Sequence, residues 1–220
     1  MSVDAASASE PGDRASASEP GVDGSGTQSQ VSRAFAAIDA ANADDPNTIV
    51  VRGERRPKEQ AHAELAVEWV RRLVPDPSDA LLLAARAHHV RRWDIPRSDE
   101  PDGRAGYLKW KRRLQQHHAD VAGDALAGIV DPDTIERVQA IVRKERLRDD
   151  PDVQALEDAL CLVFVETQFG ELADQLGDDH MVDVVVKTLR KMSPAGREAA
   201  LALPLDDDAL RIVGRALESL

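Results

Sequence analysis

The sequence lacks the residues on which several common kinds of site depend. It has 1 cysteine in 220 residues, so it forms neither an internal disulfide nor a Cys-x-x-Cys pair for metal or redox chemistry. It also lacks a glycine-rich phosphate loop and a Gly-x-Ser-x-Gly elbow, which excludes the enzyme classes built on those motifs. The lone Cys161 lies in an apolar run, and we expect it to be a buried hydrophobic residue rather than a nucleophile.

Long apolar runs are missing as well. No stretch approaches the ~18 uncharged apolar residues that a membrane span needs. The first residues do not show the basic-then-apolar pattern of a signal peptide. These absences predict a cytoplasmic protein that does not contact a membrane.

Basic residues are outnumbered, and few of them are lysine. The chain has 28 Lys and Arg against 40 Asp and Glu, which gives a net charge of -12. An acidic surface of this kind resists association when salt screens charges strongly, so the composition favours a halophilic source. The negative charge also disfavours nucleic acid as a partner.

The chain divides into a polar tail and one helical domain. Residues 1–30 are mostly Ala, Ser, Gly, Pro, Asp and Glu and contain the heptapeptide ASASEPG twice, so we expect a disordered tail. Residues 31–220 are predicted to form a single all-α domain, because apolar residues recur there at helical spacing. The expected helices cover about 31–42, 57–73, 79–92, 104–129, 179–191, 194–203 and 208–220, two more begin at Asp131-Pro132 and Asp150-Pro151, and a brief extended segment covers 48–52.

Histidines on apolar helix faces are the first candidate site residues. His62 precedes Leu65 by three residues and Trp69 by seven, so it shares their face, and His118 shares a stripe with Leu114. A hydrogen-bonded core residue is the alternative role for each of these histidines.

Two carboxylates interrupt the most apolar helix. Glu157 and Asp158 lie in LEDALCLVF, and a carboxylate buried there needs a partner or a metal ion. Imidazoles and carboxylates together can hold Zn²⁺, Mn²⁺ or Fe²⁺ while leaving coordination positions open. We therefore predict a divalent metal ion as the cofactor, with Mn, Fe, Zn or Mg as candidates and Glu157 as the candidate general base.

The order of these residues resembles that of the HD-domain superfamily of metal-dependent phosphohydrolases. AARAHHV is similar to the apolar run before the superfamily's His-Asp doublet, with His88 at the histidine position and His89 in place of the aspartate. The resemblance implies an HD-like helical fold in which His62, His88, His118 and Asp158 bind metal. His89 stands where the superfamily has a carboxylate that bridges two metal ions. The resemblance therefore implies a site for one metal ion, with His89 as a further ligand.

Longer strings resemble a second, widespread family to which the resemblance assigns no activity. They are RRWDIPR, GYLKWKRRL, HHAD, LEDALCLVF and KMSP, in a region from about Pro57 to Leu203. Because these strings are long and specific, we expect the chain to be a member of that family.

Basic residues gather between Arg86 and Arg113, where nine Arg and Lys face four acidic residues. A guanidinium binds phosphate oxygens in two-point contacts, so Arg92, Arg97 and Arg113 are candidate phosphate ligands. Ordinary solvent-exposed arginine on a charged helix is the alternative. The interleaved aromatic residues either stack on a nucleotide base or pack the loop.

The sequence favours a metal-dependent hydrolase of a phosphorylated small molecule, with a nucleotide as one candidate. The alternative is a non-catalytic helical module that retains an HD-like pocket for a ligand or partner, because the doublet lacks its aspartate. An RNA-associated protein that uses the basic segment is a third reading, which the overall acidity disfavours.

Overall fold

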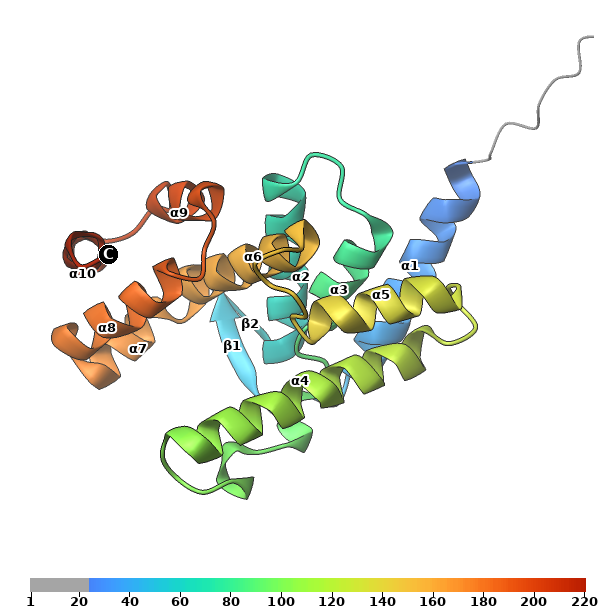
Figure 1. The fold of residues 1–220 in the computed structure, drawn as a ribbon, viewed down its shortest axis with the longest axis horizontal. Coiled ribbons are helices and arrows are strands. Elements are labelled where there is room, and N and C mark those ends of the chain that lie inside the picture. Colours follow the sequence, from blue (N-terminus) through green and yellow to red (C-terminus); the bar gives the residue numbers. More distant parts are fainter. Residues whose placement is uncertain (1–23) are drawn as a thin grey trace, which may run out of the picture.

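The computed structural model describes residues 24–220, with side chains from residue 30 onward. Over this range the chain is helical apart from one short hairpin, which confirms the predicted all-α class (Figure 1). The predicted tail falls largely on residues 1–23, which lie outside the described residues. The first helix begins at Gly24, so the last part of the predicted tail belongs to that helix.

The helices follow the predicted order, with one addition after the apolar helix. Their bounds are α1 (Gly24–Ala41), α2 (Lys58–Leu73), α3 (Asp79–Ala87), α4 (Arg104–Leu126), α5 (Pro132–Val142), α6 (Pro151–Thr167), α7 (Phe169–Leu176), α8 (Asp178–Leu189), α9 (Pro194–Leu201) and α10 (Asp207–Glu218). Ser78, Asp131, Asp150 and Ser193 cap α3, α5, α6 and α9 by accepting hydrogen bonds from first-turn N–H groups. None of these described helices is both long and apolar enough to cross a membrane.

A β-hairpin precedes α2, where the sequence predicts only one extended segment. Strands β1 (Thr48–Val51) and β2 (Glu54–Pro57) pair antiparallel, with Val51 opposite Glu54. The two connecting residues, Arg52 and Gly53, have φ of 50° and 85°, as a type I′ turn requires.

The core forms around α2, α3 and α6. Every residue of α3 from Ala80 to Ala85 is buried, and this helix packs against α1, α2, α5 and α6. Helix α6 also contacts α7 and α9, so it joins the two ends of the molecule. Figure 1 shows α7 to α10 gathered at one end and α1 and α5 at the other, with α4 running along the lower side of the view.

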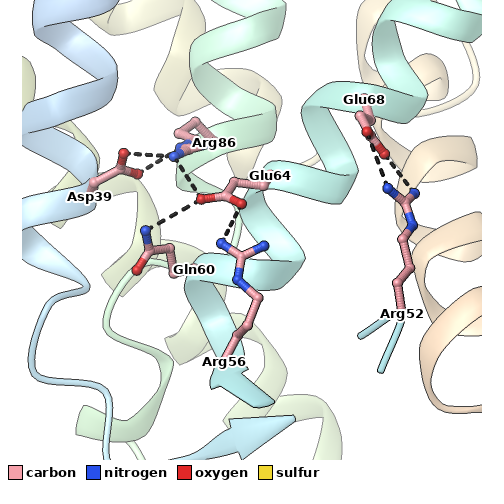
Figure 2. Close-up of polar contacts among 7 residues, drawn as sticks. All are labelled: Asp39, Arg52, Arg56, Gln60, Glu64, Glu68 and Arg86. Carbon is pink, nitrogen blue, oxygen red and sulfur yellow. Dashed lines mark hydrogen bonds and ion pairs between the residues drawn. The ribbon is translucent and has the colours of Figure 1, made fainter. Parts of the chain in front are cut away.

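Ion pairs tie α1, the hairpin and α3 to α2 (Figure 2). Arg86 of α3 donates two hydrogen bonds of 2.6 Å to Asp39 of α1 and lies 3.4 Å from Glu64 of α2. Arg56 of β2 donates to the same Glu64 at 2.5 Å. These contacts hold the first turns of α2 in place, and that part of the helix carries two residues of the site described next.

Candidate functional site

One carboxylate and one imidazole lie near the start of α2. Glu59 and His62 are three residues apart and therefore share a helix face, and each residue is only 3% exposed. The backbone N–H of Glu59 donates to the Asp45 carboxylate at 2.7 Å, which fixes the start of the helix. Glu59 Oε2 lies 3.6 Å from His62 Nδ1. Sequence reasoning missed Glu59, although its spacing from His62 was the available signal.

The histidine pair lies in a turn rather than in a helix. Helix α3 ends at Ala87 instead of near Arg92, and His88 and His89 begin the turn that follows. His88 Nδ1 donates to the Ala85 carbonyl at 2.8 Å. The His89 ring centroid lies 4.2 Å from that of His88, and His89 Nδ1 lies 3.2 Å from Glu59 Oε2. Of the two histidines, His89 is therefore the one that faces Glu59 of α2.

Helix α4 adds His118 to the same region. His118 Nδ1 donates to the Val90 carbonyl at 2.8 Å, and its ring centroid lies 5.6 Å from that of His89. Because Nδ1 carries the hydrogen that is donated to the carbonyl, Nε2 has a free lone pair. A metal-binding histidine uses this tautomer. His118 Nε2 is buried and has no hydrogen-bond partner.

The donor atoms of Glu59, His62 and His89 all lie within 4.8 Å of one another. Among the described side chains, the buried polar atoms without a hydrogen-bond partner are Glu59 Oε2, His62 Nε2, His89 Nδ1 and His118 Nε2. Leaving such an atom unpaired costs about 1–3 kcal/mol, so four in one region fit the ligands of an ion.

The chemistry of this donor set narrows the choice of ion. Two imidazoles and one carboxylate can bind catalytic zinc or mononuclear iron. Mg²⁺ prefers oxygen ligands, so this set suits Mg²⁺ less well than Zn²⁺, Fe²⁺ or Mn²⁺. The sequence-predicted ligands His62 and His89 belong to the cluster, and His88 and His118 lie beside it.

Burial keeps His88, His89 and His118 neutral near pH 7 by lowering the pKa of each imidazole. It lowers the pKa of His89 to about 4, although the neighbouring Glu59 opposes the shift. Burial lowers the pKa of His118 to about 3 and that of His88 well below its ordinary value. Burial favours the neutral form of Glu59, yet the facing nitrogens of His62 and His89 hold its pKa below the ordinary value. Glu59 is therefore an ionised carboxylate and His89 a neutral imidazole, which are the forms that bind metals.

A cavity of about 190 Å³ opens beside His89, and we call it the histidine cavity. Its lining combines imidazoles with cations, namely His88, His89, His118, Arg92, Lys111 and Lys144. Burial and the nearby positive charge of Lys144 lower the pKa of Lys111. An anion in this cavity would relieve that repulsion between the two lysines.

The structure does not bring Asp158 to the imidazoles. Its carboxylate accepts hydrogen bonds from Ser193 N at 2.8 Å, Ser193 Oγ at 2.6 Å and Gln154 Nε2 at 3.0 Å. Leu156 and Leu160 line the histidine cavity, and Asp158 lies two residues from each, on another face of α6. These partners satisfy the buried carboxylate and join α6 to the start of α9.

Glu157, predicted as the general base, lies behind a lysine of the cavity. It accepts a hydrogen bond from Lys144 and lies 3.8 Å from Lys191 Nζ. Burial acts to raise the pKa of Glu157, but the charge and hydrogen bond of Lys144, together with the charges of Lys191 and Lys111, outweigh it and lower the pKa. Glu157 therefore pairs with Lys144 and does not itself line the histidine cavity.

Only one of the three predicted phosphate-binding arginines lines the histidine cavity. That residue is Arg92, whose guanidinium carbon lies 5.2 Å from the centroid of a Trp110 ring. Arg97 donates to the carbonyls of Glu100 and Pro101 at 2.7 Å and 3.0 Å. Arg113 donates to the Glu100 carboxylate at 2.9 Å, so it also serves the loop before α4.

Comparison with known proteins gives the family of the chain. A family model described as a domain of unknown function, DUF4202, matches residues 32–213. The chain belongs to the DUF4202 family. All five strings singled out in the sequence lie within the region that matches DUF4202.

Membership of DUF4202 assigns no chemistry to the site. Comparisons with curated proteins and with solved structures found no match. The relation to HD-domain enzymes, the cytoplasmic location and the halophilic source stay predictions.

Proposed function

We propose that this DUF4202 chain is a metal-dependent hydrolase of phosphorylated small molecules, with nucleotides as one candidate class. One observation carries the proposal: His89 belongs both to the metal-binding cluster and to the histidine cavity. Its Nδ1 faces Glu59 beside His62, and its ring lines the cavity with Arg92 and Lys111. A phosphate group in the cavity would therefore lie next to the ion.

Each residue of the site has a definite task in this proposal. Glu59, His62 and His89 hold the ion, because their donor atoms lie within 4.8 Å of one another. The bound ion would supply a water of lowered pKa and polarise the phosphate. Arg92 and Lys111 neutralise the phosphate oxygens, because cationic donors stabilise the charge on a transferring phosphoryl group.

Hydrolysis in this cavity exchanges one bond to phosphorus for another. The oxygen of water bonds to phosphorus, the bond from phosphorus to the leaving oxygen breaks, and the leaving oxygen takes up the proton that the water releases. Lys144, held by Glu157, lines the same cavity. The carboxylate of Glu157 acts through Lys144 and has no direct part in these bonds.

A non-catalytic binding module is the second candidate, and one observation favours it. The described residues that line the histidine cavity include no carboxylate, because Glu157 and Asp158 face other partners. A cavity with cations and no general base can bind a phosphorylated ligand without turning it over.

Metal-supplemented hydrolysis assays distinguish the two candidates. The purified chain is supplied with Zn²⁺, Mn²⁺ or Fe²⁺ and given p-nitrophenyl phosphate and a panel of nucleoside 5′-monophosphates. We expect turnover with at least one metal, and loss of turnover in His89→Ala but not in His180→Ala, which removes an exposed imidazole of α8. Binding of the monophosphates without release of phosphate under any of these metals would replace the hydrolase with the binding module.

A further inference from the structure

A second cavity borders the metal-binding cluster from another side. It also has a volume of about 190 Å³, and we call it the Glu59 cavity because Glu59 forms part of its wall. Glu59 Oε2 lies 3.2 Å from His89 Nδ1, and His89 lines the histidine cavity. The two cavities therefore approach the cluster through two different residues, His89 and Glu59.

Arg92 and Trp110 line both cavities and form the wall that the cavities share. The Arg92 guanidinium lies over a Trp110 ring at 5.2 Å from its centroid. Stacking of this kind uses the face of the guanidinium and leaves its N–H donors, which lie in the plane, available to other groups. Arg92 can thus donate to a ligand group in either cavity.

The Glu59 cavity carries positive charge of its own. Lys58 and Arg97 line it together with Arg92, and its one carboxylate is Glu59. In the part of the chain that the structure describes, Lys58 and Arg92 form no salt bridge, and Arg97 donates only to carbonyls. With Glu59 bound to an ion, the remaining charge of this wall is cationic.

We infer that the ligand of this site carries two anionic groups, one held in each cavity, with the metal centre between them. The group in the histidine cavity contacts Lys111 and Lys144, the group in the Glu59 cavity contacts Lys58, and Arg92 serves both. A bisphosphorylated small molecule or a nucleoside diphosphate has this chemistry. The inference rests on the proposed function, because the first anionic group is the phosphate of that proposal.

Two matched pairs of probes test for the second anionic group. AMP is compared with ADP, and fructose 6-phosphate with fructose 1,6-bisphosphate, by calorimetric titration of the metal-loaded chain. We expect the doubly phosphorylated member of at least one pair to bind about tenfold tighter or more, since its second phosphate gains a charge-assisted hydrogen bond from Lys58.

Substitutions then show which cavity is responsible for the tighter binding of the doubly phosphorylated probe. Lys58→Met should remove the gain and leave binding of the monophosphate unchanged, whereas Lys111→Met should weaken both members of the pair. Lys187→Met is the matched control, because Lys187 is an exposed lysine of α8 and lines neither cavity. The Lys187→Met chain should behave like the parent.

The outcomes separate this inference from the proposed function. Monophosphate binding without any gain for the second phosphate, or a gain that survives Lys58→Met, overturns the two-anion ligand alone. Absence of both metal and monophosphate binding overturns the proposed function, and the two-anion ligand with it.

Discussion

Replacing Asp158 with alanine should destabilise the fold and leave metal binding intact. The carboxylate is 4% exposed and accepts three hydrogen bonds, two from Ser193 and one from Gln154. Hydrogen bonds to a charged group contribute about 1.5–3 kcal/mol each, and the carboxylate's own desolvation offsets part of their sum. We expect a net loss of about 3 kcal/mol, which for a domain of this size lowers Tm by roughly 6–12 °C.

Urea denaturation and metal analysis of the same preparations check this reasoning. Asp158→Asn is the matched variant: an amide oxygen in place of Oδ1 still accepts the hydrogen bonds from Ser193 N and Gln154 Nε2, so this variant should lose about half as much stability. Both variants should bind the parent's amount of metal below their unfolding transitions. If both variants fold but bind no metal, Asp158 is a metal ligand, as the HD-like resemblance implies. Its carboxylate then faces the ion and not Ser193.

Three further perturbations have expected results. The free energy of unfolding should fall as the pH falls from about 6.5 to 4.5, by up to about 1.4 kcal/mol per pH unit for each buried neutral histidine. The reason is that such an imidazole binds a proton in the unfolded chain but stays neutral in the folded one. His118, with its pKa of about 3, is one such group, so His118→Gln should flatten the slope in urea titrations across that window. Gly196→Ala should cost about 1–3 kcal/mol, because the added Cβ would lie 2.6 Å from Asp158 Cγ, and a Tm unchanged from the parent would contradict that contact. Arg86→Leu should lower stability by about 1–3 kcal/mol in urea titrations, because it leaves Asp39 without its paired donors, and an unchanged midpoint would show that the network of Figure 2 adds nothing.

Helical periodicity and capping residues were sufficient to predict most of the fold. The predicted helix starts at Asp131-Pro132 and Asp150-Pro151 are confirmed, because an aspartate cap followed by proline suits a first turn. The second strand was missed because Glu54 to Pro57 shows no alternation of apolar and polar residues. The early end of α3 at Ala87 was missed because the apolar spacing continues to Val90, while the turn depends on contacts from α4 and Asn42.

The candidate site could be predicted in part. His62 and His118 were assigned to inward faces because their helices have clear apolar stripes, and both are buried. Helix α6 is apolar nearly all round, so its sequence gives no phase that would show which way Asp158 points. The contact of Glu59 with His89 joins segments thirty residues apart, and no local pattern predicts such a contact.

The metal content of the purified chain tests the central claim most directly. After expression with added Zn²⁺, Mn²⁺ or Fe²⁺, elemental analysis should find about one ion per chain in the parent and in His180→Ala. His89→Ala and Glu59→Gln should retain less than about a tenth of that amount, because each removes one of the three clustered donors. A folded parent without metal under all three supplements, or a His89→Ala chain with the parent's content, would contradict the account.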